Sequence, residues 1–215
     1  EGDAHILLTH VHWDHIQGLP FFTPMLIPGN RACIYGPDAE LASRLLAQMH
    51  ESFCPVPNFF AEGIGADIDV VEVGDCTFDI GSLHITATRL NHCGVTGLGY
   101  RVEAGGRSIA YLPDVEYLEE AHREQVAAMV QGVDLLFHDA MLTAEEYPSH
   151  RGSGHCSIDD GINVAGRAGV GRLVLFGHHP DRSDTEIDQI LAACSGNGLQ
   201  VDAAREGSEY TLQED

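Results

Sequence analysis

The chain has 215 residues, and 33 acidic residues against 11 basic ones give it a formal net charge of −22 at pH 7. One domain is the simplest count for this length. The acidic balance repels polyanions, and nucleic-acid binders usually carry a basic stripe, so nucleic-acid partners are disfavoured and a small-molecule substrate is favoured. No apolar run approaches the length of a membrane span and no signal peptide is evident, so we expect no membrane association.

The first half of the chain is rich in predicted strands. An apolar run at residues 6–8 predicts a short buried strand. Apolar spacing predicts a helix over Pro37 to Phe53, and the prolines that follow predict an irregular loop over Cys54 to Gly65. Ala104-Gly105-Gly106 is typical of a hairpin turn between two strands. The β-like runs of this region cover residues 70–73, 76–80, 84–89, 100–103 and 108–112.

The second half alternates strands and helices. Residues 116–130 are predicted to be helical and residues 135–137 to form a buried strand. Ser157 and Asp160 have the spacing of a capping box, so a second helix is expected to begin there. A further strand at residues 173–176 and a helix at residues 185–193 complete the pattern. We therefore expect an α/β protein with sheets packed between helices.

Six residues near the start read His10-Val11-His12-Trp13-Asp14-His15, a combination that no packing requirement explains. If His10 and His12 ended a strand, both imidazoles would point to the same side, because side chains alternate with period two. Crowded imidazoles and carboxylates can bind a divalent metal ion, and two ions would use them more fully than one. The alternative is a polar loop with accidental histidines, although solvated loops are usually built from Gly, Asn, Ser and Lys.

Further metal-ligand residue types follow other predicted strands. Ligands collected from several strand ends onto one sheet edge predict a metal site at that edge. Alternatives stay open, since His92 could be an exposed hairpin residue, Asp114 a turn or helix cap, and His155 a loop-stabilising residue. His138 has two equal interpretations, a partner of a metal-ligand carboxylate or a simple strand-end residue. The clusters after strands are Asn91-His92, Asp114, His138-Asp139 and His178-His179.

The pattern Thr9-His10-x-His12-x-Asp14-His15, with later His92, Asp114 and His178, resembles the metallo-β-lactamase-fold hydrolases over nearly the whole chain. The resemblance implies an αββα sandwich with two metal ions in one site. Two adjacent cations lower the pKa of a bridging water and supply a hydroxide nucleophile. Zinc suits a mixed His/Asp set best, with manganese or iron as alternatives. The implied ligands are His10, His12 and His92 on one ion, Asp14, His15 and His178 on the other, and Asp114 as the bridge.

A second resemblance narrows the class. His138-Asp139-Ala140, Gly154-His155-Cys156-Ser157 and Leu173-Val174-Leu175 resemble C-terminal motifs of the RNase Z branch and related phosphodiesterases. The resemblance implies His155 as the general acid, oriented by Asp139, a role that suits an imidazole titrating near neutrality. Asp14 joins these two as a catalytic residue. RNase Z-like spacing puts the last ligand on Gly177, so His178 and its fallback His179 both remain open.

Two further departures from the family pattern matter. The usual N-terminal strands and glycine-rich turn are missing before the first motif, so we expect one N-terminally incomplete domain over residues 1–215. The long basic arm of RNase Z is also missing, which agrees with the acidic balance. Six cysteines without any C-x-x-C pair predict reduced, mostly buried thiols in a cytoplasmic protein.

The sequence as a whole predicts a binuclear metal-dependent hydrolase of a small phosphodiester, a cyclic nucleotide being one candidate. A carbonyl-ester hydrolase (a lactonase, thioesterase or β-lactamase) is the first alternative. A non-catalytic metal-binding regulatory module is the second. The family is commonly dimeric, so a homodimer is expected, although nothing in the sequence locates an interface.

Overall fold

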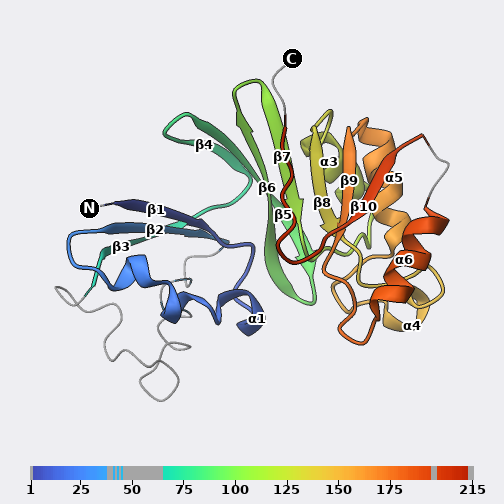
Figure 1. Ribbon diagram of the computed structural model, residues 1–215, viewed down its shortest axis with the longest axis horizontal. Helices are drawn as coiled ribbons and strands as arrows, with labels where there is room; N and C mark the ends of the chain where they lie inside the picture. The colour runs from blue at the N-terminus through green and yellow to red at the C-terminus, as the bar shows by residue number, and fades with distance from the viewer. Residues whose placement is uncertain are drawn as a thin grey trace. The chain divides into compact units, whose positions relative to one another are not determined.

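The computed structural model describes residues 2–37, 41, 43, 45, 65–194 and 198–212. The chain divides into two compact units, one up to Asp75 and one from Cys76 onward (Figure 1), and each is described by itself. That the whole chain forms one domain stays a prediction. Among the described residues, no helix combines the length and the apolar character needed to cross a bilayer.

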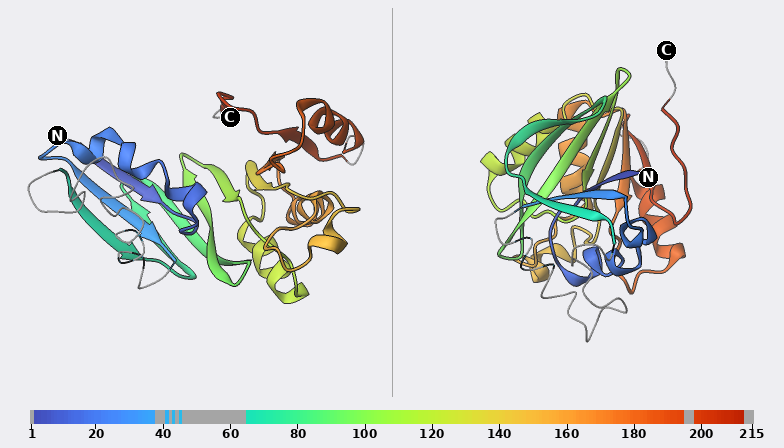
Figure 2. Two further views of the ribbon diagram at one scale, coloured as in Figure 1. Left: turned by 90° about the horizontal axis from the view of Figure 1, so that it is seen from below. Right: turned by 90° about the vertical axis from the view of Figure 1, so that its left-hand side faces the viewer.

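The first unit is built on a parallel three-stranded sheet in the order β1-β2-β3. Its strands are β1 (Asp3–Leu7), β2 (Arg31–Gly36) and β3 (Asp67–Glu72). Short helical segments follow β1 and cover one face of this sheet (Figure 2): helix α1 (Trp13–Ile16) and two 3₁₀ turns, Leu19–Phe21 and Thr23–Leu26. Each 3₁₀ turn has a proline in its first positions, where a fixed φ favours helical backbone. Ile16, Met25 and Ile34 are fully buried between these segments and the sheet.

Several predictions for the first unit needed correction. Strand β1 ends at Leu7, so His10 and His12 lie beyond the strand and the alternation argument for their rings was wrong. Strand β2 was missed, although Ala32 and Ile34 alternate with less buried neighbours. Of the predicted helix over residues 37–53, Leu41, Ser43 and Leu45 are helical. Its other residues apart from Pro37, and residues 54–64 of the predicted loop, lie outside the described residues.

The second unit contains a seven-stranded sheet in the order β10-β9-β8-β7-β6-β5-β4. Strands β4 to β7 pair antiparallel, whereas β7 to β10 pair parallel. Helices α3 and α5 pack against each other on one face of the sheet (Figure 1), around a core that includes Leu112, Val126 and Val164. The strands are β4 (Cys76–Ile80), β5 (Leu83–His92), β6 (Val95–Ala104), β7 (Arg107–Leu112), β8 (Leu135–Asp139), β9 (Arg172–Phe176) and β10 (Gln200–Ala203), and the helices are α3 (Glu120–Met129), α4 (Tyr147–His150), α5 (Ile158–Ala168) and α6 (Asp184–Ala193).

Local sequence signals account for most boundaries in this unit. In the β6–β7 turn, Gly105 has a φ of 56° and Gly106 a φ of 75°. Both values lie in the left-handed region that favours glycine and that a tight hairpin turn requires. The predicted capping box of α5 is confirmed, because the Ser157 side chain accepts from the Asp160 amide and Asp160 reciprocates. Strand β10 and the single helical turn α4 were missed, and α3 begins at Glu120 rather than at residue 116.

The register of the sheet brings several strand ends to one edge. Leu112 of β7 pairs with His138 of β8, which pairs with Leu175 of β9, and all three strands run parallel. Strand β5 shares their direction, because β6 runs antiparallel to both β5 and β7. The residues that end or follow these strands, His92, Asp114, Asp139 and His178, therefore stand at the same edge of this sheet, as the sequence predicted.

The described cysteines are free thiols, as expected. Cys156 and Cys194 are buried and Cys33 is half-buried. Cys76 and Cys93 are exposed, however, so the prediction of mostly buried thiols holds for only part of the set.

Candidate metal centre

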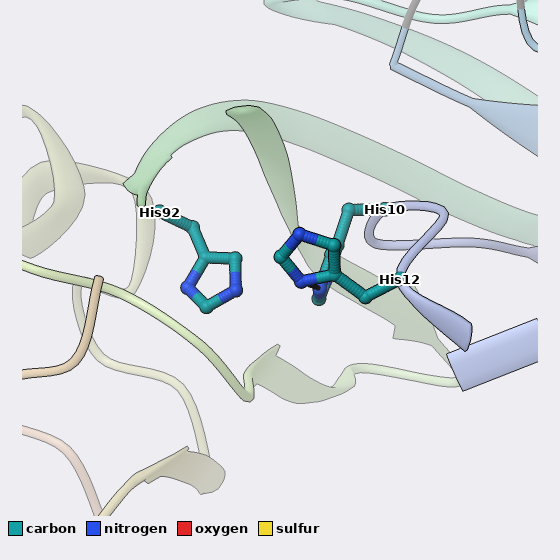
Figure 3. Close-up of side chains that lie close together, drawn as sticks. All are labelled: His10, His12 and His92. Carbon is teal, nitrogen blue, oxygen red and sulfur yellow. Dashed lines mark hydrogen bonds between the residues drawn. The ribbon is translucent and has the colours of Figure 1, made fainter. Parts of the chain in front are cut away.

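The histidine motif of the first unit occupies the loop after β1 and the short helix α1. The His10 imidazole is buried, with Nδ1 3.1 Å from the Thr9 hydroxyl and Nε2 3.0 Å from Nδ1 of His12. The His10 and His12 rings meet edge to face, with centroids 4.5 Å apart (Figure 3). The His15 ring centroid lies 4.2 Å from that of His10. Local chain folding, rather than strand alternation, thus gathers these imidazoles.

The last two residues of this motif, Asp14 and His15, belong to α1. The helix begins at Trp13, with His12 at the N-cap position, and the His15 amide donates to the His12 carbonyl at 3.0 Å. The Asp14 side chain is 75% exposed, and its Oδ2 lies 3.5 Å from Nε2 of His15. Asp14 is therefore a carboxylate that is open to solvent.

In the second unit, His92 is the last residue of β5 (Figure 3), and a backbone carbonyl fixes its ring. Its Nδ1 lies 2.8 Å from the carbonyl oxygen of Gly154. A carbonyl can only accept, so Nδ1 of His92 must carry a proton and donate it. Nε2 of the same ring lies 3.7 Å from Oδ2 of Asp114. Metal-binding histidines are commonly oriented in this way, by donating the other ring nitrogen to a carbonyl.

His92, Asp114 and His155 form a cluster in the second unit. Each offers one donor atom, and these atoms all lie within 4.8 Å of one another. The rings of His92 and His155 are in T-shaped contact at 5.0 Å. His155, expected as a proton donor, therefore stands directly beside two predicted ligands.

A buried carboxylate holds His155. The Nδ1–H of His155 donates to Oδ2 of Asp139 at 2.7 Å, and the Asp139 side chain is fully buried. Burial raises the pKa of Asp139 to about 6, against the hydrogen bond from His155, which lowers it. Burial by itself lowers the pKa of His155, but the hydrogen bond and charge of Asp139 outweigh it and raise that pKa above 6.5. The hydrogen bond to Asp139 therefore favours the protonated form of the His155 imidazole.

Asp139 is itself fixed by backbone amides. Val115 N donates to its Oδ2 at 3.1 Å, and Met141 N donates to its Oδ1 at 3.0 Å. The Val115 amide directly follows Asp114, so the loop that carries a predicted ligand also positions the carboxylate behind the predicted acid.

His178 follows β9 and has an unusual environment. Its Nε2 is buried and has no hydrogen-bond partner among the described residues. Burial lowers the pKa of His178, and the positive charge of Arg182 adds to that effect, so the ring is neutral at pH 7. Nδ1 of the neighbouring His179, in contrast, accepts from the amide of Asp181 at 3.3 Å. His178 does not join a group of three donors in the described part of the chain.

These residues fit a divalent metal ion. Imidazoles and a nearby carboxylate are the donor types that zinc prefers. The orphaned Nε2 of His178 adds a second observation, because a buried nitrogen without a partner is costly unless something else binds it.

The structure also resolves the two interpretations of His138. Its Nδ1–H donates to the carbonyl of Asp139 at 2.9 Å, and its Nε2 accepts from the Tyr117 hydroxyl at 2.7 Å. Burial lowers its pKa to about 4, so the ring is neutral. Gly161 of α5 leaves room for it, since a Cβ there would stand 2.8 Å from Nδ1. His138 is thus a buried strand-end residue that supports the backbone of Asp139.

One residue of this region was missed. Glu116 is 2% exposed and accepts hydrogen bonds from Tyr147, Gly152 and Gly154. No local pattern marks it, because all of these donors lie more than thirty positions later in the sequence.

Comparison with known proteins identifies the family. A family model described as "Beta-lactamase superfamily domain" matches residues 3–179. The chain belongs to this family. Ribonuclease Z from Porphyromonas gingivalis is 24% identical to this superfamily member over 224 residues, which cover 83% of the chain and 72% of the relative.

Two solved structures show the same fold as this β-lactamase superfamily protein. Human tRNase Z, short form, superposes with a TM-score of 0.68 at 20% identity and covers 98% of this chain and 79% of its own. A new diphosphatase from the PhnP family superposes with a TM-score of 0.70 at 20% identity, covering 97% and 71%. The metallo-β-lactamase α/β fold predicted from the sequence is confirmed, and the protein is a metal-dependent hydrolase.

The names of the relatives weaken one expectation. Ribonuclease Z and tRNase Z are enzymes named for RNA, so a net charge of −22 is a poor reason to disfavour nucleic acid. The acidic balance bears on how fast a polyanion approaches, not on whether the site can process one.

Proposed function

We propose that this protein hydrolyses a small phosphodiester with the help of two divalent metal ions. The observation that carries the proposal is the buried Asp139–His155 pair beside His92 and Asp114. Phosphodiester cleavage expels an alkoxide, which needs a proton, and His155 is a proton donor held next to metal-ligand residue types. The name of the ribonuclease relative supports this bond class, and the name of the diphosphatase neighbour supports hydrolysis at phosphorus more broadly.

The proposed ligands are those of the sequence motifs. Zinc is the preferred ion, with manganese or iron as alternatives. The fixed Nδ1–H of His92 and the orphaned Nε2 of His178 support these two residues in particular, and the second favours His178 over His179. When bound, such ions supply Lewis acidity to the phosphoryl group and to water. The proposed set is His10, His12, Asp14, His15, His92, Asp114 and His178.

The chain's own residues would handle the proton. His155 donates from Nε2–H to the departing oxygen, while its Nδ1–H stays on Asp139. The amides of Val115 and Met141 keep the Asp139 carboxylate in place, and the carboxylate in turn holds the orientation of the His155 ring. Asp14, exposed at the start of α1, is proposed both as a ligand and as a catalytic carboxylate.

The proposal extends to substrate size and setting. We propose a small phosphodiester such as a cyclic nucleotide as the substrate, and RNA is the alternative that the substrate panel below tests. Free thiols at the described cysteines agree with a reducing, cytoplasmic setting. We also propose a single domain and a homodimer, on the family resemblance alone.

A substrate panel tests the function. Protein loaded with zinc or manganese is assayed on bis(p-nitrophenyl) phosphate, a cyclic nucleotide, a precursor tRNA, a lactone and nitrocefin. We expect chelator-sensitive hydrolysis of the first two and none of the lactone or nitrocefin. Activity confined to the lactone or nitrocefin would overturn the proposal. Cleavage of precursor tRNA at a higher kcat/KM than the cyclic nucleotide would replace the small substrate with RNA.

A further inference from the structure

Glu116 is a buried carboxylate that the reaction outlined above does not use. Its Oε1 accepts from the Tyr147 hydroxyl at 3.1 Å and from the Gly152 amide at 2.7 Å, and its Oε2 accepts from the Gly154 amide at 2.9 Å. Its own amide donates to the carbonyl of Asn91 at 2.9 Å. Glu116 therefore ties the end of β5 and the loop after β7 to the segment 147–154.

The part of this segment that follows α4 contains two glycines, which leave its backbone with many accessible conformations. Gly152 and Gly154 both have a φ of 90°, a region that glycine enters easily and other residues rarely adopt. Adopting one conformation costs such a segment conformational entropy, and contacts with the rest of the protein must offset that cost. A buried carboxylate that accepts from both glycine amides supplies such contacts.

The same segment contacts the candidate metal centre. The carbonyl of Gly154 accepts the Nδ1–H of His92, and His155 is the next residue along the chain. The approach is close, because a Cβ on Gly154 would stand 2.6 Å from Nδ1 of His92 and 2.5 Å from the Cys93 amide nitrogen. A small shift of Gly154 would therefore release the His92 ring and move His155.

We propose that Glu116 is a positioning residue for the metal centre. It fixes the backbone of Gly152 and Gly154, so that the Gly154 carbonyl keeps the proton of His92 on Nδ1 and leaves Nε2 for a metal ion. The inference rests on the proposed function in one respect, the role of His92 as a ligand. A carboxylate is required, because the two glycine amides are bound by different oxygens. A glutamine would turn an NH₂ group toward one of them.

The central experiment compares Glu116→Gln with Glu119→Gln. Glu119 lies in the same connection and is exposed, and its side chain makes no capping hydrogen bond to α3, so its variant is a control for the lost charge. In the metal-free protein, long-range ¹H–¹⁵N NMR reads the tautomer of His92. Competition with a chromogenic chelator then measures Zn²⁺ affinity. We expect Glu116→Gln to mix the two tautomers and weaken Zn²⁺ binding about 10-fold, the lower end for partners of metal ligands, and Glu119→Gln to change neither.

A second variant keeps the inference testable if Glu116→Gln fails to fold. Tyr147→Phe removes one donor to Glu116 and leaves both glycine amides in place. We expect it to fold and to weaken Zn²⁺ binding about threefold, because the two hydrogen bonds from the glycine amides to Glu116 remain. An unchanged His92 tautomer and Zn²⁺ affinity in a folded Glu116→Gln, or in Tyr147→Phe when Glu116→Gln is unfolded, would overturn the inference.

These readouts separate the inference from the proposed function. Zn²⁺ affinity and the His92 tautomer need no substrate, so inactivity toward every phosphodiester would leave them informative. If the wild-type protein bound no Zn²⁺, the proposed function would fail, while the NMR comparison would still decide whether Glu116 fixes His92.

Discussion

The first unit concentrates four predicted ligands within six residues, where the rings of His10, His12 and His15 lie against one another. In the second unit, His92, Asp114 and His178 come from three separate strand ends, and a backbone carbonyl from a remote segment, that of Gly154, positions His92. The contrast separates two ways of building a site. A contiguous motif carries its own geometry, whereas dispersed ligands depend on residues that never touch the metal ion.

The test with a large expected effect removes one proposed ligand from each unit. We expect His12→Ala and Asp114→Asn each to lower kcat/KM more than about 100-fold. Mutating a residue that only positions a metal ligand already lowers metal affinity or activity about 10- to 100-fold, and loss of a ligand itself should cost more. Bound metal, measured by elemental analysis, should fall with activity. His84→Ala is the matched control, since that histidine is 49% exposed and pairs only with Asp79 among the interactions described. Full activity in either ligand variant would break the proposed set.

The predicted proton donor belongs to the second unit and should behave as an acid. We expect His155→Ala to slow hydrolysis of a methyl phosphodiester by about 10²- to 10⁴-fold, the usual contribution of a general acid. The p-nitrophenyl ester should suffer far less, because its leaving group departs without a proton. Asp139→Asn should follow the same pattern, since Asp139 holds the imidazole. Equal losses on both esters would contradict the acid role.

A pair of glycines tests how tightly the second unit holds its ligands. Gly152 and Gly154 share a φ of 90°, but a Cβ meets nothing within 4 Å at Gly152 and meets the Cys93 amide nitrogen at 2.5 Å at Gly154. Both alanine variants carry the same backbone strain. We therefore expect Gly154→Ala to weaken Zn²⁺ affinity about 10-fold more than Gly152→Ala. Equal affinities in the two variants would show that the close approach to His92 is unimportant.

The last test concerns the residue that supports the strand ends, and it measures the free energy of unfolding rather than activity or metal binding. The pKa of His138 is about 4 in the fold against an ordinary 6.5, so folding favours the neutral ring. Its stabilisation is complete above pH 6.5 and is lost as pH falls toward 4, a change of about 3 kcal/mol. Urea unfolding of the metal-free protein and of His138→Asn should give stabilities that converge over this range. A difference that does not vary with pH would contradict the assignment of a neutral buried ring.

Sequence reasoning succeeded where the signal was local. Strand β4, the Gly105-Gly106 turn and the Ser157–Asp160 capping box all depend on neighbouring residues, and each was predicted. The first motif was recognised for the same reason. The common edge of the second-unit ligands also followed, because parallel strands end together.

The failures involve tertiary contacts. The predicted helix began at residue 116, but Glu116 and Tyr117 are buried in the connection before α3, which begins at Glu120. Glu116 was invisible because its partners come from residues 147–154. His10 was assigned to a strand end, but pairing with β2 stops at Leu7. In each case the prediction relied on neighbouring residues, whereas contacts with distant residues determine the structure.

The Gly105-Gly106 hairpin has a practical consequence. It is exposed and joins the end of β6 to the start of β7, whereas Asp114 follows the opposite end of β7. An epitope or a small fluorescent reporter inserted between these glycines would project into solvent from the sheet edge opposite the one where Asp114 lies. The hairpin thus offers an attachment point for immobilising or tracking the enzyme while its chemistry continues undisturbed.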